Sequence, residues 1–144
     1  SVPEGRFTVL LPGKAQRESR TFNTAAGALA MTMHACSLKQ GTMGVSFTDY
    51  PAAEAAAGRS REHVDAARDA LLRNIGASVH SEEEVPIADL PGRQVYAEGR
   101  DGAQLKARFV VAGSRLYQIA YVGTRDGLPM ADIDMFLTSF KLIQ

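Results

Sequence analysis

Apolar and polar residues alternate with a period of two along much of the chain, which is the pattern of half-buried β-strands. Four such runs precede Pro51, and they cover residues 6–11, 14–23, 28–38 and 42–50. The last two are separated by Lys39-Gln40-Gly41 and are predicted to form a hairpin. We expect one shared inward face to set its register, carrying Leu29, Met31, Met33, Met43, Val45 and Phe47.

A helical spacing replaces this alternation in the middle of the chain. Within residues 61–75, apolar side chains recur at i, i+3, i+7 and i+11 and form one stripe: Val64, Ala67, Leu71 and Ile75. Ser60 is expected to cap the amino end of this helix, and Gly76 stands where a left-handed residue ends it. The segment therefore predicts one long helix.

After Gly76 the period returns to two. The run at residues 77–85 carries Glu82-Glu83-Glu84, which we interpret as a solvated edge strand, with Ca²⁺ binding alongside Asp89 as the alternative. Residues 92–98, 104–111 and 115–122 are then predicted to form a meander with glycine-containing turns. The last of these strands is apolar on both faces, which is typical of a central strand. A final helix is expected to begin at Pro129 and to pack on the sheet.

These elements predict the α+β class. We expect an antiparallel sheet of about six to eight strands, with one long helix mid-chain and a C-terminal helix packed on it. No repeat or linker divides the chain, so residues 1–144 are expected to form a single domain.

Composition narrows the classes of function. The 144 residues include 16 Lys and Arg and 16 Asp and Glu, and a net charge of zero argues against a nucleic-acid-binding protein. No apolar run approaches the ~20 residues of a membrane helix. The single cysteine excludes an internal disulfide. Since the chain begins at Ser1 rather than Met, we expect that its amino end was either processed or trimmed, and processing would allow a preceding signal peptide or lipid-attachment segment.

Several short motifs, in order, resemble the PsbP-like family, whose architecture the Mog-type Ran-binding import factors share. The chain opens with Phe-x-Val-x-x-Pro-Gly at residues 7–13, and a strand ends in Asp49-Tyr50-Pro51. The long helix follows, and the remaining motifs are Pro91-Gly92-Arg93, Arg115-Leu116-Tyr117 and Thr138-Ser139-Phe140-Lys141-Leu142. The resemblance spans residues 7–142. It implies the PsbP-like fold in a small bacterial exported or lipoprotein-type domain, and it carries over no site residue.

One string suggests metal chemistry, namely Met31-Thr32-Met33-His34-Ala35-Cys36. Thioether, imidazole and thiol groups suit Cu(I), and His34 and Cys36 are the candidate ligands. In a strand, however, the two methionines point away from His34 and Cys36. The alternative is that the methionines belong to the core and that Cys36 is a small buried apolar residue. We expect no cofactor.

Arginine outnumbers lysine by twelve to four. Because guanidinium groups suit carboxylate partners, a shared outer face of the meander would form an interaction surface, made of Arg93, Arg108, Arg115, Tyr117 and Tyr121. The alternative is dispersed surface charge. No HExxH, Gly-x-Ser-x-Gly, Gly-x-Gly-x-x-Gly or Walker motif is present, so we do not expect an enzyme.

The sequence thus favours a non-enzymatic binding or accessory domain that contacts another protein. We expect it to be exported, periplasmic or lipid-anchored, with a cytoplasmic location as the alternative and the oligomeric state left open. Such a domain predicts an apolar groove near Tyr117 and Tyr121 or between helix and sheet. A carrier of a small ligand or soft metal is the alternative function, and it predicts a concave pocket with convergent polar groups.

Overall fold

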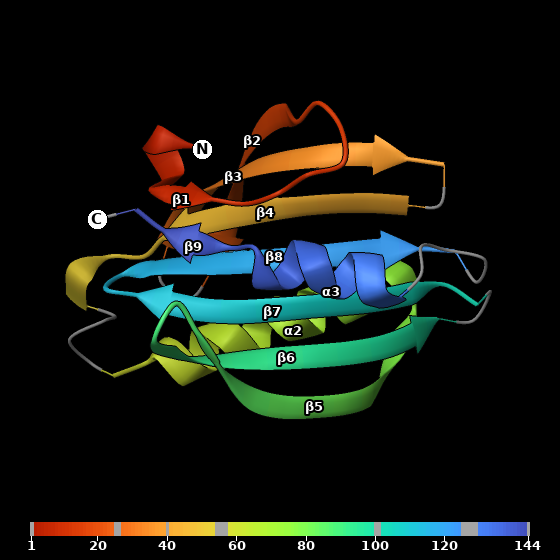
Figure 1. Cartoon of the computed structure of the whole chain (residues 1–144). Helices are drawn as coiled ribbons and strands as arrows, with labels where there is room; N and C mark the ends of the chain where they lie inside the picture. The colour runs from red at the N-terminus through yellow and green to blue at the C-terminus, as the bar shows by residue number, and fades with distance from the viewer. Residues whose placement is uncertain are drawn as a thin grey trace.

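A seven-stranded antiparallel sheet forms the centre of the molecule, as the computed structural model shows (Figure 1). The structure describes residues 2–24, 27–39, 41–53, 58–99, 102–124 and 130–143. The strand order is β2-β3-β4-β8-β7-β6-β5. The strands are β2 (Gln16–Thr24), β3 (Gly27–Leu38), β4 (Gly41–Asp49), β5 (Ala77–Ile87), β6 (Leu90–Gly99), β7 (Gln104–Ala112) and β8 (Arg115–Gly123).

The two long helices that the structure describes pack on opposite faces of the sheet. Helix α2 (Ser60–Ile75) packs on one face against β5, β6 and β7, whereas α3 (Met130–Thr138) packs on the other face against β7 and β8. Beside α3, β1 (Phe7–Thr8) pairs with β9 (Lys141–Leu142) in a small second sheet. Figure 1 shows α3 and β9 in front of the main sheet and α2 behind it.

Two hydrophobic clusters fill the two sides of the sheet. On the α3 side, Phe7 lies among the rings of Phe47, Tyr117 and Phe140, with centroid separations of 6.3, 6.0 and 5.6 Å. On the α2 side, Phe109 and its neighbours pack under the helix. Strand β8 contributes to both clusters from the middle of the sheet, which confirms the central position predicted from its two apolar faces.

The expected fold class is wrong in the number of its helical segments. The chain is mostly antiparallel sheet, with 57% of the described residues in strands, and its helical segments differ in number from the two expected. A 3-10 helix, η1 (Pro3–Gly5), opens the chain, and Ala52 and Ala53 are also helical. The three residues of η1 are too few to show a 3.6-residue period, so the spacing of apolar residues could not reveal this element. The predicted helix start at Pro129 lies outside the described residues.

The sequence correctly predicted the residue that ends α2 but not the residue that caps its amino end. Gly76 ends the helix in the left-handed conformation, with φ of 60°, as predicted. Ser60, in contrast, is the first helical residue rather than the cap. The cap position is held by Arg59, which makes no side-chain capping hydrogen bond.

The register of the β3–β4 hairpin also differs from the prediction. Leu38 pairs with Gly41 across a two-residue connection, so odd residues of β3 lie opposite even residues of β4. Met31 therefore faces Thr48, and Met33 faces Ser46. Cross-strand partners share a face, which puts the methionines on the α2 side and Met43, Val45 and Phe47 in the core on the α3 side. The methionine pair is half-buried and is not part of either buried cluster.

Candidate functional site

A groove of about 920 Å³ lies between α2 and the β2–β4 half of the sheet. Its origin is the position of the helix. Because α2 packs mainly on β5, β6 and β7, no helix among the described residues covers the same face of β2, β3 and β4. The groove therefore results from the arrangement of helix and sheet. Its volume lies within the range of small-molecule sites, roughly 300–1,000 Å³.

The floor of the groove combines apolar and small polar side chains from three adjacent strands. Strand β3 contributes Met31, Met33 and Ala35, β4 contributes Thr42, Gly44, Ser46 and Thr48, and β8 contributes Gln118, Ala120 and Val122. The residues of β4 that face the groove are all small, whereas their neighbours on the core side are large. This difference leaves open space above β4.

The side chains on the helix wall of the groove are also mostly small. Ala66, Ala67 and Ala70 face the groove together with Leu71. Alanine is the strongest helix former, so these positions keep α2 stable without filling the space beside it. The apolar stripe predicted for the helix thus serves two purposes, since Val64 is buried in the core and Ala67 and Leu71 also line the groove.

One end of the groove is marked by a ring stack. Tyr50 and His63 lie face to face, with centroids 3.7 Å apart and planes 10° apart. Arg20 lies at this end because its cross-strand neighbours are Met31 and then Thr48, and Arg59 precedes the first turn of α2. The amino end of α2, which has no side-chain cap, is the positive end of the helix dipole.

The rim is positively charged although the chain is neutral. The described residues that line the groove include three arginines, Arg20, Arg59 and Arg73, and one acidic residue, Glu62. Arg20 also approaches Glu18, with Nη2 to Oε2 at 3.4 Å, and both side chains are well exposed. Since net charge is zero overall, the rim is a local excess of positive charge. Such an excess attracts an anion to the mouth of an apolar site.

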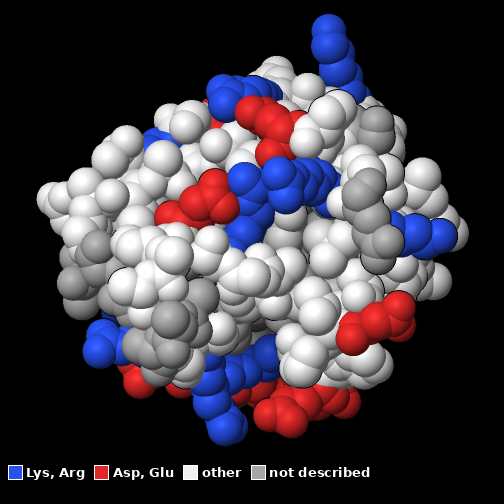
Figure 2. Space-filling model, turned by 90° about the vertical axis from the view of Figure 1, so that its left-hand side faces the viewer, with Lys and Arg blue, Asp and Glu red and all other residues white. Residues whose placement is uncertain are grey.

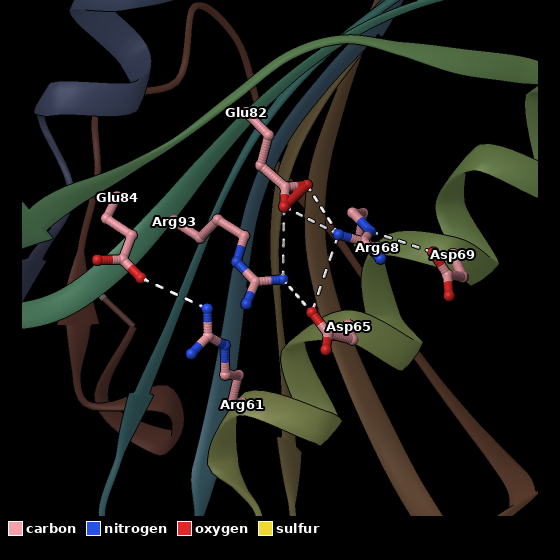
Figure 3. Close-up of polar contacts among 7 residues, drawn as sticks. All are labelled: Arg61, Asp65, Arg68, Asp69, Glu82, Glu84 and Arg93. Atoms are coloured by element: carbon pink, nitrogen blue, oxygen red, sulfur yellow. Dashed lines mark hydrogen bonds and ion pairs between the residues drawn. The ribbon is translucent and has the colours of Figure 1, made fainter.

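Ion pairs hold α2 in the position that leaves the groove open (Figure 3). Arg93 on β6 donates through Nη1 to Asp65 on α2 and lies 3.8 Å from Glu82 on β5. Arg68 on α2 donates to both oxygens of Glu82, at 2.8 and 2.9 Å. In Figure 3, Arg93 and Arg68 alternate with Glu82 and Asp65 between helix and sheet. These contacts tie α2 to the β5–β6 side of the sheet.

The same contacts shift the pKa values of Asp65 and Arg68. The hydrogen bond from Arg93 lowers the pKa of Asp65 against the opposing effect of partial burial, and the nearby charges of Arg93, Arg68 and Arg61 lower it further. The hydrogen bond to Glu82 raises the pKa of Arg68. Both shifts favour the charged forms that pair.

Arg93→Met is expected to lower the free energy of unfolding by about 1–3 kcal/mol, because it leaves Asp65 and Glu82 without this donor. The pKa of Asp65 is lowered in the folded protein, so its contribution is present above the ordinary value of 3.8 and is lost as pH falls through the lowered pKa. Urea unfolding of the wild-type and Arg93→Met proteins should therefore show a difference in the free energy of unfolding that is constant above about pH 5 and shrinks under more acidic conditions. Arg61→Met is the control, since Arg61 is exposed and lies 3.9 Å from Glu84. An equal loss in both variants would contradict this account.

A second group of polar contacts fixes the amino-terminal segment to the opposite face. Glu4 accepts a hydrogen bond from Arg17 Nε at 2.6 Å, which is the main cause of the lowered pKa of Glu4. Arg115 donates to both oxygens of Asp49, at 2.7 and 2.9 Å, and to the carbonyl of Glu4 at 3.0 Å. Figure 2 views this end of the molecule and shows acidic and basic side chains interspersed on it. Each of these charges therefore has a partner of opposite sign or a carbonyl group within hydrogen-bond distance.

The two candidate metal ligands lie on the α3 side of β3. His34 stacks on Phe47 at 6.4 Å and has Nε2 2.9 Å from Glu4 Oε1, whereas Cys36 is buried. Met31 and Met33 face the groove on the other side. Among the described residues, no group of three or more His, Cys, Asp or Glu side chains is arranged to hold a metal ion.

The five residues expected to form an interaction surface do not lie together. Arg93 faces α2, whereas Arg108 and Arg115 point to the other side of the sheet, where Arg108 donates to Gln94 at 2.8 Å. Tyr117 and Tyr121 are buried in the core, and the Tyr117 hydroxyl donates to the Gly5 carbonyl at 2.6 Å. The alternation of the strands separates the arginines, and the apolar faces of β8 bury the tyrosines.

None of the helices in the described part of the chain has the length and apolar character needed to cross a membrane.

Comparison with known proteins adds little to this geometry. No protein-family model and no curated protein matches the chain. The crystal structure of PA94 from Pseudomonas aeruginosa, a protein of unknown function, is similar with a TM-score of 0.43 and 13% sequence identity. The match covers 83% of this chain and 76% of that chain. A likeness this distant carries no argument, so the PsbP-like resemblance stays a prediction.

The groove floor was the part of the site that sequence reasoning missed. A signal for it exists in β4, where Thr42, Gly44, Ser46 and Thr48 alternate with large apolar residues. A strand face made only of small and hydroxyl-bearing residues next to a helix with three alanines leaves unfilled volume. Recognising it requires the β3–β4 register, because only that register places Met31 and Met33 on the same face.

Proposed function

We propose that this chain is a non-enzymatic binding protein whose groove receives an elongated apolar molecule with an anionic end. The observation that carries this proposal is the combination of an open, mostly apolar groove with a positively charged rim in a protein of zero net charge. This is the small-ligand alternative from the sequence, and the groove favours it over a protein partner because its volume fits a small molecule.

The apolar body of the ligand lies along Met31, Met33 and the alanines of α2. Methionine side chains are flexible and polarisable, so they adapt to ligands of different shape. Thr48 and Ser46 are buried in the floor, and their hydroxyl groups offer a few polar contacts within an otherwise apolar site. Clefts that bind small molecules commonly have this composition.

The anionic end lies at the Tyr50–His63 end of the groove. Two guanidinium groups, those of Arg20 and Arg59, and the positive end of the α2 dipole are at this position together with the carboxylate of Glu62, whereas Arg73 lies toward the other end. Guanidinium groups pair with carboxylate, sulfonate and phosphate groups through two parallel hydrogen bonds. The ligand is therefore oriented as well as bound.

Several titratable groups with shifted pKa values belong to structural contacts away from the groove. They are Glu4, Arg17, Asp65, Arg68, Tyr96 and Arg115. All of them lie outside the lining of the groove, and their shifts arise from structural ion pairs and from partial burial. Export and lipid attachment remain predictions from the sequence.

A matched pair of fluorescent probes tests the proposal. Anilinonaphthalene sulfonate and N-phenyl-1-naphthylamine have the same aromatic body, and only the first carries an anionic group. We expect saturable binding of both, with the sulfonate bound about tenfold more tightly, which corresponds to one charge-assisted interaction. Arg59→Gln should remove most of this difference and leave the affinity for the neutral probe unchanged.

Arg61→Gln is the control, because Arg61 lies on the same helix and does not line the groove. It should leave the affinities for both probes unchanged. Equal affinity of the wild-type protein for the two probes would refute the anionic end, and failure to bind either probe would refute the groove as a ligand site.

A further inference from the structure

Strand β2 leaves one edge of the main sheet open. It is the first strand in the order and pairs with β3 alone among the described residues. Residues 16–23 are exposed along the whole strand, and the pairing with β3 has no bulge. Such an edge presents main-chain N–H and C=O groups that can pair with another strand.

The opposite edge of the sheet is protected in three ways. Strand β5 has a register shift between Val79 and Ser81, three consecutive glutamates, and a proline at position 86. Bulges, charges and prolines are the devices by which proteins block pairing at an edge. Strand β2 contains neither a proline nor a bulge, and its three charged residues, Arg17, Glu18 and Arg20, are of both signs, so a strand with the complementary order of charges can pair with it.

The sequence of β2 is complementary to itself in antiparallel orientation. A two-fold axis perpendicular to the sheet keeps each side chain on its own face of the sheet. Residues that pair across the axis must therefore be both odd or both even in number, so the axis lies between one residue and the same residue of the second copy. An axis at Arg17, Glu18 or Arg20 would put like charges directly opposite each other, which is destabilising. An axis at Ser19 instead places Glu18 opposite the partner's Arg20, and Arg20 opposite the partner's Glu18.

We propose that β2 pairs with β2 of a second copy of this chain about an axis at Ser19. Two opposite-charge pairs then flank the axis, and the pairing continues to Gln16 opposite the partner's Phe22. Phe22 is 37% exposed in the single chain and gains a neighbour in this arrangement. The two sheets become one continuous sheet. The two grooves open on the same face, since Arg20 and Phe22 line the groove in each copy. This inference does not depend on a ligand in the groove.

Charge reversal of one residue at a time tests this pairing by sedimentation velocity across a concentration series. The wild-type protein should dimerise. Glu18→Arg and Arg20→Glu should each weaken the dimer by about tenfold or more, because each puts like charges opposite each other twice. The double variant Glu18→Arg/Arg20→Glu should dimerise like the wild type, and an equal mixture of the two single variants should form heterodimers. Both side chains are exposed, so the variants are expected to fold, which circular dichroism checks.

A cysteine at the axis gives an independent readout of the register. Ser19→Cys places two thiols directly opposite each other, so oxidation should produce a disulfide-linked dimer. Asn23→Cys on the same strand puts the two thiols about 27 Å apart, and this control should stay unlinked. A wild-type protein that is monomeric at all concentrations, or a dimer indifferent to both single charge reversals, would overturn the proposal.

Discussion

Phe7→Ala is expected to lower the free energy of unfolding by about 3–5 kcal/mol, the cost of removing a fully buried aromatic side chain. Phe7 is completely inaccessible to solvent and contacts the rings of Phe47, Tyr117 and Phe140. Strand β1, which carries it, is only two residues long, so packing of this side chain rather than β-pairing holds the amino-terminal segment on the α3 face. Denaturant unfolding followed by circular dichroism measures the loss.

Phe22→Ala is the matched control for this prediction. Phe22 is partly exposed on the edge strand, so its loss should change the free energy of unfolding by less than about 1 kcal/mol. If Phe7→Ala lowered the free energy of unfolding as little as Phe22→Ala is expected to, the amino-terminal segment would not be part of the core, and the arrangement of β1, β9 and α3 would be wrong.

Ala70→Trp is expected to abolish binding of both naphthyl probes at concentrations that saturate the wild-type protein. Ala70 is an exposed residue of α2 that faces the groove, and an indole there occupies the space above the floor. Because no core packing changes, the free energy of unfolding should stay within about 0.5 kcal/mol of the wild-type value. Fluorescence titration and urea unfolding of the same preparation separate the loss of binding from a loss of folding.

Ala131→Trp makes the same substitution at an exposed position of α3, on the other face of the sheet. This variant should bind both probes with wild-type affinity. Unchanged probe binding by Ala70→Trp would mean that the probes bind elsewhere. Equal loss in the two variants would point to a general effect of an exposed indole.

Local pattern was sufficient to predict most of the elements. The period of two located the strands of the main sheet, and the stripe from Val64 to Ile75 located α2 to within one residue. The left-handed end of α2 at Gly76 was also readable, because glycine adopts positive φ without steric cost. These features depend on residues close to one another in sequence.

Long-range features were not readable in the same way. Strand β9 pairs with β1 across more than a hundred residues, and two residues on each side give no periodic signal. Helix α2 lies over β5–β7 through apolar packing and through ion pairs such as Arg93 with Asp65, and neither set of partners can be chosen from sequence alone. The sequence predicted a groove between helix and sheet as one of two locations, but its lining follows from the position of α2 and from the β3–β4 register.

The same reasoning explains why the arginine-rich meander was misleading. Arg93 and Arg108 are separated by the faces of the sheet, and each is bound to a partner of its own. The arginines that matter for the proposed site, Arg20 and Arg59, come from the edge strand and from the start of α2. Sequence counts identify an excess of arginine but not the surface on which it gathers.

The most direct test of the proposed groove uses the methyl groups of the five methionines as NMR reporters. Met31 and Met33 line the groove, whereas Met43 is buried on the α3 side and Met130 and Met135 lie on α3. Titration with anilinonaphthalene sulfonate should shift the Met31 and Met33 signals in a saturable way and leave the other three unchanged. Shifts confined to Met130 and Met135, or no shift at saturating probe, would contradict binding in the groove between α2 and strands β2–β4.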